Sequence, residues 1–165
     1  MPTIFCSTKL SKLIGLKTKL STPIKDDWNG HLFAVQGRKC IAFVHKETFY
    51  SFAMFDVLKS DLKEFKKIFI GNFFKQLNDD GLLTTELKEK LILHYQNFEI
   101  ATTDNDRSTI GYLNDFIARI KYYRDGLPPT LEVAKEYVSC YSNENLIGVR
   151  SYINAKELML EYLNK

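Results

Sequence analysis

The sequence predicts an α+β fold in which an N-terminal antiparallel β-meander packs against a set of about four to five helices. Residues 31–55 contain three apolar segments separated by short turns, a pattern typical of consecutive antiparallel strands. From residue 60 onward the apolar residues recur with helical spacing. The chain has 165 residues, of which 45% are hydrophobic and 26% charged, values typical of a globular protein. We therefore expect a single domain over residues 1–165.

The N-terminal segment is expected to form a strand followed by a short helix. Residues 3–6 have the pattern of a short strand, and Ser7 or Thr8 can cap a helix over residues 9–16. Residues 1–25 carry five lysines and no acidic residue, so this segment could contact phosphate or an acidic partner. A solvated helix face is the simpler explanation of the same charges.

The strongest strand pattern lies between residues 31 and 55. Residues 31–36 and 39–45 are expected to form a hairpin around Gly37 and Arg38, and residues 49–55 a third strand. Because these strands are apolar on both faces, helices must cover the meander on at least one side.

The second half of the chain alternates helical patterns with short connections. Ser60, Thr130 and Asn154 are suitable residues to cap helices. A short strand is expected over residues 98–102. Helices are expected over residues 60–78, 85–97, 108–124, 130–141 and 154–163.

The sequence favours a cytoplasmic protein that does not contact a membrane. Its N-terminus lacks a basic segment followed by an apolar stretch, as a secretory signal would require. Its apolar stretches are far shorter than the roughly 20 residues that span a bilayer. Cys6, Cys40 and Cys140 are widely spaced, so we expect buried thiols rather than a disulfide framework or a zinc site.

Signatures of the common enzyme classes are absent from the sequence. It contains no glycine-rich phosphate loop, no G-x-S-x-G motif and no H-E-x-x-H motif. Its three histidines are far apart, so a metal site would have to be assembled by the fold. Neither a cofactor nor a metal is expected.

The first candidate site surrounds the single tryptophan. Asp27, Trp28 and His31 stand together where the chain enters the hairpin. They could form a small polar pocket walled by the indole, in which Asp27 orients His31. Alternatively, Trp28 fills the core while Asp27 and Asn29 bond to backbone groups of the loop.

The second candidate site is the start of the helix expected over residues 108–124. Arg107, Gly111 and Asn114 fall in one row of that helix, with Ser108 and Asp115 beside them. A glycine inside a helix indicates close approach by another group. That group could be the sheet, with Arg107 paired to an acid such as Asp27, or an anionic ligand held at the helix start.

Three motifs of the chain resemble those of one known family. Residues 5–10 are similar to its strand, Cys-Thr and lysine-rich helix. Residues 27–32 match a D-W-x-x-N-L hairpin start, except that His31 stands where the pattern has Asn. The residues that match an N-x-R-S-x-x-G-x-x-N-D helix start are Asn105, Arg107, Ser108, Gly111, Asn114 and Asp115.

The family that these motifs resemble consists of short bacterial proteins with an uncharacterised domain, often found in mobile or accessory gene neighbourhoods. The resemblance spans nearly the whole chain. It supports the fold boundaries and implies no activity, cofactor or partner.

The leading functional hypothesis is a non-enzymatic binding or regulatory protein that engages another protein or a small anionic ligand. The missing catalytic signatures and the many aromatic residues favour it. Tyrosines expected at the surface are Tyr122, Tyr123, Tyr137, Tyr141 and Tyr152.

Two other functions are less well supported by the sequence. A small hydrolase or transferase could act on a phosphate-bearing substrate, with Arg107 holding the anion and Asp27, His31 or Asp115 supplying acid–base chemistry. Nucleic-acid binding is the weakest hypothesis, because the net charge is only +3. The sequence does not indicate an oligomeric state.

Overall fold

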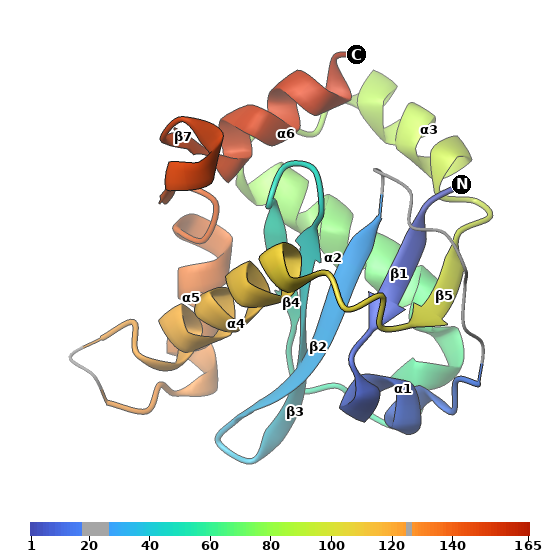
Figure 1. Cartoon of the computed structure of the whole chain (residues 1–165), viewed down its shortest axis with the longest axis vertical. Coiled ribbons are helices and arrows are strands. Elements are labelled where there is room, and N and C mark those ends of the chain that lie inside the picture. The colour runs from blue at the N-terminus through green and yellow to red at the C-terminus, as the bar shows by residue number, and fades with distance from the viewer. Residues whose placement is uncertain (18–26, 125–126) are drawn as a thin grey trace.

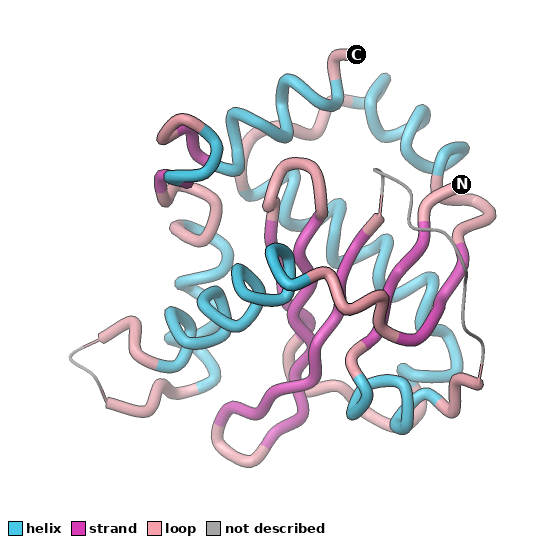
Figure 2. Tube along the Cα trace, viewed as in Figure 1, coloured by secondary structure: helices cyan, strands magenta, loops and turns pink. Residues whose placement is uncertain are grey.

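A mixed β-sheet lies at the centre of the molecule, with helices on both of its faces (Figure 1 and Figure 2). This computed structural model describes residues 1–17, 27–124 and 127–165. Within those residues the sheet has five strands in the order β4-β3-β2-β1-β5. The strands are β1 (Thr3–Cys6), β2 (Trp28–Val35), β3 (Arg38–His45), β4 (Ser51–Met54) and β5 (Glu99–Thr102).

The expected antiparallel meander is formed by β2, β3 and β4. Both central residues of the β2–β3 turn, Gln36 and Gly37, have positive φ values of 49° and 74°. This is the conformation of a type I′ turn, whose twist matches that of paired strands. The α+β class and the meander are therefore confirmed, with the turn one residue earlier than expected.

The sheet is not purely antiparallel, because β1 pairs in parallel with both β2 and β5. In register, Ile4 lies beside Trp28 on one side and Ile100 on the other. Parallel neighbours need a long crossover connection, and α1 provides part of the connection from β1 to β2. The sequence predicted these two strands but not their place in the sheet.

Three of the six described helices are capped by residues that the sequence indicates, whereas the predicted cap Ser60 precedes the 3-10 helix Asp61–Glu64 and accepts no capping hydrogen bond. Ser7, Thr130 and Asn154 each accept a hydrogen bond from a backbone N–H of the first helical turn. Where four to five helices were expected, the described residues form six. They are α1 (Thr8–Ile14), α2 (Phe65–Asp79), α3 (Thr85–His94), α4 (Arg107–Lys121), α5 (Leu131–Cys140) and α6 (Ala155–Leu163). Shorter elements are η1 (Asp61–Glu64), η2 (Gly148–Arg150) and a two-stranded pair, β6 (Leu146–Ile147) and β7 (Ile153–Asn154).

One face of the sheet carries an aromatic core built around Trp28. This side chain is fully buried and makes edge-on contacts with Phe52, Phe69 and Phe73, whose ring centroids lie 5.0 to 5.5 Å away. Its indole Nε1 donates to the Tyr95 hydroxyl at 2.9 Å. The core is completed by residues of α1, α2 and α3 and by Met159 of α6.

The opposite face of the sheet is covered by α4 and α5. Leu113, Phe116, Ile117 and Ile120 of α4 pack against Val44 and its neighbours in β2 and β3. Figure 1 shows α4 crossing this face in front of the sheet, with α2 behind it. Because both faces are covered, the strands can be apolar on both sides.

The prediction that all three cysteines are buried is wrong for one of them. Cys6 and Cys40 are buried as expected, but Cys140 lies at the end of α5 and is exposed. Residues 18–26 lie outside the described part of the chain, and with them two of the five lysines of the basic N-terminal segment. No helix in the described ranges is long and apolar enough to cross a membrane.

Candidate functional site

A small pocket lies on the α4 side of the sheet and is lined in part by the loop that connects β5 to α4. We call it the β1–β5 pocket, because it opens where these two parallel strands end. Its volume is about 190 Å³. It is lined by Phe5, Ser7, Thr8, Asn29, Gly30, His31, Thr103, Asn105, Ile110 and Leu113. The carboxyl ends of parallel strands are the usual ligand-binding edge of such sheets.

Alternation along β2 decides which side chains reach this pocket. Trp28 faces the aromatic core, and a Cβ placed on Gly30 would point to the same side, 3.0 Å from the Phe43 ring. Successive side chains of a strand point to opposite faces, so Asn29 and His31 face α4 and the pocket.

The Asn29 side chain is buried without a hydrogen-bond partner. Only 3% of the residue is exposed, and neither Oδ1 nor Nδ2 bonds to any group in the described chain. Its cross-strand neighbours are Phe5 on β1 and Val44 on β3, which offer no polar side-chain atoms. A buried amide without partners costs about 1–3 kcal/mol, so this position is unfavourable unless something binds there.

His31 lies two residues further along the same face of β2 and is half-buried. Burial lowers the pKa of its imidazole, and the positive charges of Lys9 and Lys121 lower it further. The ring is therefore neutral at neutral pH, with one nitrogen a donor and the other an acceptor. The same two lysines contribute positive charge near His31.

The loop after β5 forms the opposite wall of the pocket, and its own side chains fix its shape. Thr103 Oγ1 accepts from the Asn105 N–H at 3.1 Å, and Asn105 has a left-handed φ of 59°. Asp106 caps α4 by accepting from the N–H groups of Ser108 and Thr109. These N–H groups are therefore occupied, so the start of α4 does not itself present them to a ligand.

A partly buried ion pair between Lys46 and Asp104 attaches the loop after β5 to the end of β3. Lys46 Nζ donates to the Asp104 carboxylate and lies 3.6 Å from Asp106 Oδ2. The same ammonium group lies 5.0 Å from the centroid of the Phe5 ring, which lines the pocket. Lys46 thus pairs with both loop carboxylates, and its single positive charge offsets one of their two negative charges.

The structure brings together only part of the residues predicted around Trp28. Asp27 is fully buried, and its Oδ1 accepts from the Thr3 backbone N–H at 2.9 Å. It lies four residues before His31 in an extended segment, about 13 Å away, so it cannot orient the imidazole. Trp28 belongs to the aromatic core on the other face. Of this predicted group, His31 alone lines the pocket.

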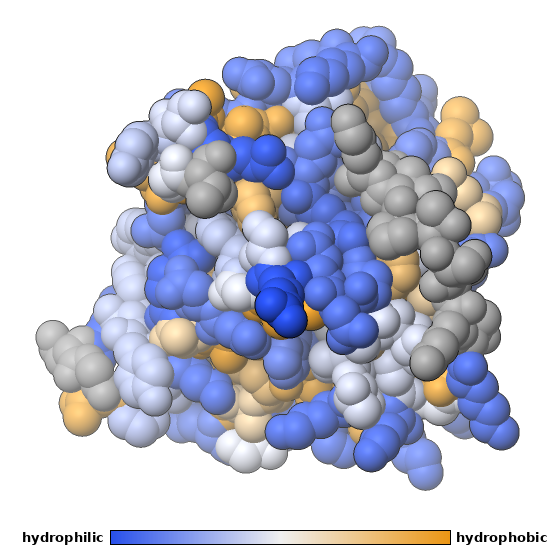
Figure 3. Space-filling model, in the orientation of Figure 1, coloured by the Kyte–Doolittle hydropathy of each residue, from blue (hydrophilic) through white to orange (hydrophobic). Residues whose placement is uncertain are grey.

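The residues predicted at the start of α4 lie outside the pocket. Arg107, Ser108, Asn114 and Asp115 are exposed, and Arg107 forms no ion pair with any described residue, Asp27 included. Asp115 pairs with Arg119 at 3.4 Å. The pocket instead uses Asn105, Ile110 and Leu113 from the same segment. Figure 3 shows that the face carrying α4 is largely hydrophilic, with apolar residues in small separate areas.

Gly111 does not mark a close approach. A Cβ at this position would meet no other described atom within 4 Å, apart from the backbone of its own helix. The residue is exposed on the outer row of α4. Neither the sheet nor any other described element therefore requires a glycine there.

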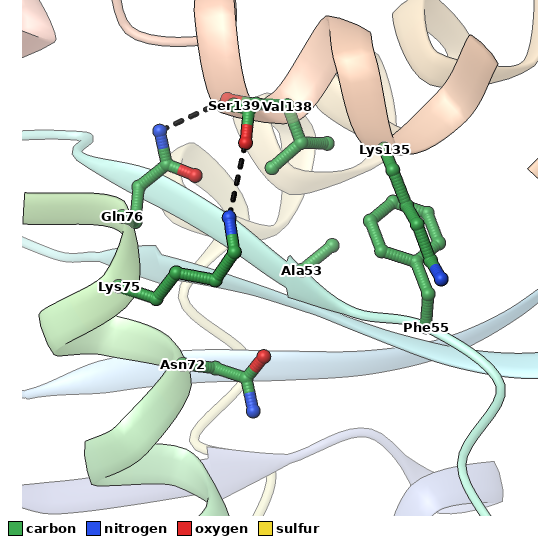
Figure 4. Close-up of a pocket in the computed structure, with 8 residues that line it drawn as sticks. All are labelled: Ala53, Phe55, Asn72, Lys75, Gln76, Lys135, Val138 and Ser139. Carbon is green, nitrogen blue, oxygen red and sulfur yellow. Dashed lines mark hydrogen bonds between the residues drawn. The ribbon is translucent and has the colours of Figure 1, made fainter. Parts of the chain in front are cut away.

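A second pocket of about 270 Å³ lies between α2 and α5 (Figure 4). Two hydrogen bonds join its lining residues across the pocket. Gln76 Nε2 donates to the Val138 carbonyl at 2.9 Å, and Lys75 Nζ donates to Ser139 Oγ at 3.1 Å, as Figure 4 shows. This pocket therefore lacks the unpartnered buried group that distinguishes the β1–β5 pocket.

Comparison with known proteins identifies a family but no function. The family model described as Domain of unknown function (DUF6933) matches residues 3–158. No curated protein and no solved structure matches the chain.

Proposed function

The chain belongs to the DUF6933 family of domains of unknown function, and we propose that it is a non-enzymatic binding protein for a small anionic ligand in the β1–β5 pocket. One observation carries the proposal: Asn29 is buried in the pocket wall with both polar atoms of its amide unpartnered. A ligand that bonds to this amide would recover the hydrogen bonds lost when the side chain was buried.

The groups around the pocket favour a ligand with negatively charged oxygens. Asn29 Nδ2, the hydroxyls of Ser7 and Thr8, and one nitrogen of His31 are potential donors. Lys9 and Lys121 add positive charge at His31. Asn29 Oδ1 in turn needs a donor from the ligand. The ligand class is therefore a small oxyanion that also carries a hydroxyl hydrogen.

The size of the pocket limits the ligand. A volume of about 190 Å³ is smaller than the roughly 300–1,000 Å³ of pockets for drug-sized molecules. Phosphate, which carries a P–OH group at neutral pH, and small hydroxy acids such as glycolate fit these requirements. Sulfate and acetate have matching charge and similar size but lack the hydroxyl hydrogen.

A titration followed by two-dimensional ¹H–¹⁵N NMR tests this function. Phosphate and glycolate should shift the side-chain NH₂ signals of Asn29 at lower concentration than sulfate and acetate do. Equal responses to phosphate and sulfate would show that Asn29 Oδ1 plays no part, and no response to any of the four would refute the proposal.

Matched substitutions separate the amide from general effects. Asn29→Asp keeps the shape of the side chain, removes its donors and adds a negative charge, so it should abolish the response to phosphate. Asn97→Asp makes the same change at an exposed position outside the pocket and should leave the response intact. A response that survives Asn29→Asp would place the anion elsewhere.

The alternative of a phosphate-directed hydrolase or transferase has less support. Of the residues that it requires, His31 lines the pocket, whereas Asp27 is buried between β1 and β2, and Arg107 and Asp115 are exposed outside the pocket. A neutral imidazole alone can bind an anion but lacks the neighbouring groups that acid–base catalysis uses.

We also propose a cytoplasmic location. It is supported by three free cysteines, which are typical of proteins in reducing compartments. Expression of a tagged chain followed by fractionation of the cells tests it, and recovery from an extracytoplasmic fraction would overturn it.

A further inference from the structure

We infer that the protein has a second binding site, between α4 and α5, for a small aromatic carboxylate. The site is an open pocket of about 570 Å³ that we call the tyrosine pocket. It is lined by Ala118, Arg119, Tyr122, Tyr123, Tyr137, Tyr141 and Asn145. None of these residues lines the β1–β5 pocket, so the inference is independent of the function proposed above.

Tyrosine rings form the walls of this pocket. Tyr123 packs against Tyr137 and Tyr141, with ring centroids 4.8 and 5.6 Å apart. Tyr122 and Tyr141 remain 62% and 46% exposed, so their rings can contact a ligand that enters from solvent. Aromatic walls of this kind favour a flat, apolar ligand body.

Arg119 supplies the charge that selects an anionic head group. Its guanidinium carbon lies 5.1 Å from the centroid of the Tyr112 ring, which supports it on one side. The only carboxylate that pairs with it in the described chain is Asp115, 3.4 Å from Nε, and the Asp115 side chain is 67% exposed. The arginine is therefore held in place by a ring and paired only loosely with an acid.

The donors on one edge of the guanidinium make no hydrogen bond of good geometry. Arg119 Nε and Nη2 are both shielded from water, and their neighbours, the Asp115 carboxylate and the Tyr112 hydroxyl, do not meet them at hydrogen-bonding geometry. These two nitrogens form the edge that holds both oxygens of a carboxylate in a bidentate pair. A ligand carboxylate at this edge would supply the missing acceptors.

The charge and the shape of the tyrosine pocket together favour one class of ligand, a small aromatic carboxylate. The guanidinium edge requires a carboxylate, and the four tyrosines require an aromatic group attached to it. Both nitrogens of this edge are shielded from water, so a carboxylate reaches them only when a lining side chain moves; Tyr122 and Tyr141 are the most exposed of the lining tyrosines. No covalent step is involved.

Binding of benzoate, measured by isothermal titration calorimetry, tests the inference. Benzamide has the same ring without the charge, and acetate has the carboxylate without the ring, so both should bind at least about tenfold more weakly than benzoate. Benzamide or acetate binding as tightly as benzoate would overturn the inference, as would the absence of benzoate binding at millimolar concentration.

Two substitutions locate the binding. Arg119→Lys keeps the positive charge but removes the bidentate edge, so benzoate affinity should fall about tenfold. Arg38→Lys is the matched control, because Arg38 lies in the β2–β3 hairpin and pairs with Asp56; it should leave the affinity unchanged. Equal affinities of the Arg119→Lys and Arg38→Lys variants would refute the site.

A further variant covers the case in which Arg119→Lys unfolds the protein. Tyr122 is largely exposed at the end of α4, so Tyr122→Ala should preserve the fold, which circular dichroism verifies. Loss of a stacking wall should weaken benzoate binding several-fold in this variant. Undiminished affinity in a folded Tyr122→Ala protein would contradict the inference.

Discussion

The side-chain amide of Asn143 bonds to both the backbone N–H and the backbone carbonyl of Ser51, as a residue of a neighbouring strand would. Its Oδ1 accepts from the Ser51 N–H at 2.8 Å, and its Nδ2 donates to the Ser51 carbonyl at 2.9 Å. Nδ2 also donates to Asp80 Oδ2 at 3.0 Å. Ser51, Asp80 and Asn143 are all buried, so this side chain joins β4 to the end of α2 and to the segment after α5.

Substitution of Asn143 should be strongly destabilising. Asn143→Ala leaves two backbone groups of Ser51 and one oxygen of Asp80 without these partners in the protein interior. We expect the free energy of unfolding to fall by about 3 kcal/mol, measured by urea denaturation. Asn78→Ala changes an exposed position of α2 and should alter it by less than about 0.5 kcal/mol. A loss at Asn143 no larger than that at Asn78 would contradict the assigned role.

Asp80 should make stability depend on pH. Burial raises the pKa of its carboxyl group, while hydrogen bonds from Tyr50, Asn143 and Gln76 lower it and offset part of the rise. The folded protein therefore keeps this proton to higher pH than the unfolded chain does. The resulting stability is complete below about pH 4 and is lost as the pH rises through the raised pKa.

The substitution Asp80→Asn tests this dependence because an amide cannot ionise. The stability of the variant relative to the unmodified protein should improve as the pH rises from about 4 through the raised pKa, and should level off above it. Urea denaturation at several pH values measures the difference. A difference that stays constant over this range would show that Asp80 ionises normally in the folded state.

Gly30 and Gly111 should respond oppositely to alanine. A Cβ on Gly30 would lie 3.0 Å from Phe43 Cε1 and 3.1 Å from Leu10 Cδ2, so Gly30→Ala should cost about 1–3 kcal/mol. A Cβ on Gly111 meets open space on a helix, so Gly111→Ala should stabilise the protein by about 1 kcal/mol. Thermal unfolding of the two variants measures both effects. Destabilisation by Gly111→Ala would show that another group does approach this glycine closely, as the sequence suggested.

His31 should bind its proton less readily than a free imidazole does. Burial and the charges of Lys9 and Lys121 lower its pKa, so its NMR titration should have a midpoint below the ordinary value of about 6.5. The stability linked to the neutral ring is present above that ordinary value and is lost as the pH falls from there through the lowered pKa of the folded protein. Lys9→Met and Lys121→Met should each move the midpoint upward. A midpoint that neither substitution moves would remove the electrostatic argument for an anion.

Much of the fold could be predicted because its signals are local. The hairpin, the caps at Ser7, Thr130 and Asn154, and the strand over residues 99–102 each depend on a few consecutive residues. The parallel pairing of β1 with β5 joins Thr3 to Glu99, and no pattern within either strand specifies that partner. Long-range pairing was therefore the part of the fold that the sequence left open.

The candidate site illustrates the same limit on a smaller scale. The sequence pattern predicts that the hairpin strand begins at residue 31, which makes Asn29 a loop residue. It lies within β2, which begins at Trp28, and alternation then directs Asn29 away from the tryptophan and into the pocket. The sequence signal that could have indicated this site is an asparagine directly after a tryptophan in an extended segment: if the indole is buried on one face, the amide must point to the other. The loop on the opposite wall comes from residues 103–105, whose position next to β2 depends on the distant pairing of β1 and β5.

The position of β1 has a consequence for how the protein is made. This strand leaves the ribosome before the other four strands of the sheet, yet one of its two edges is filled by β5, with Thr3 beside Glu99. At translation rates of about 5–20 residues per second, that edge stays open for about 5–20 s while the intervening chain is synthesised. An unpaired edge is a template for association with other chains. The nascent protein should therefore depend on chaperones until its fifth strand emerges.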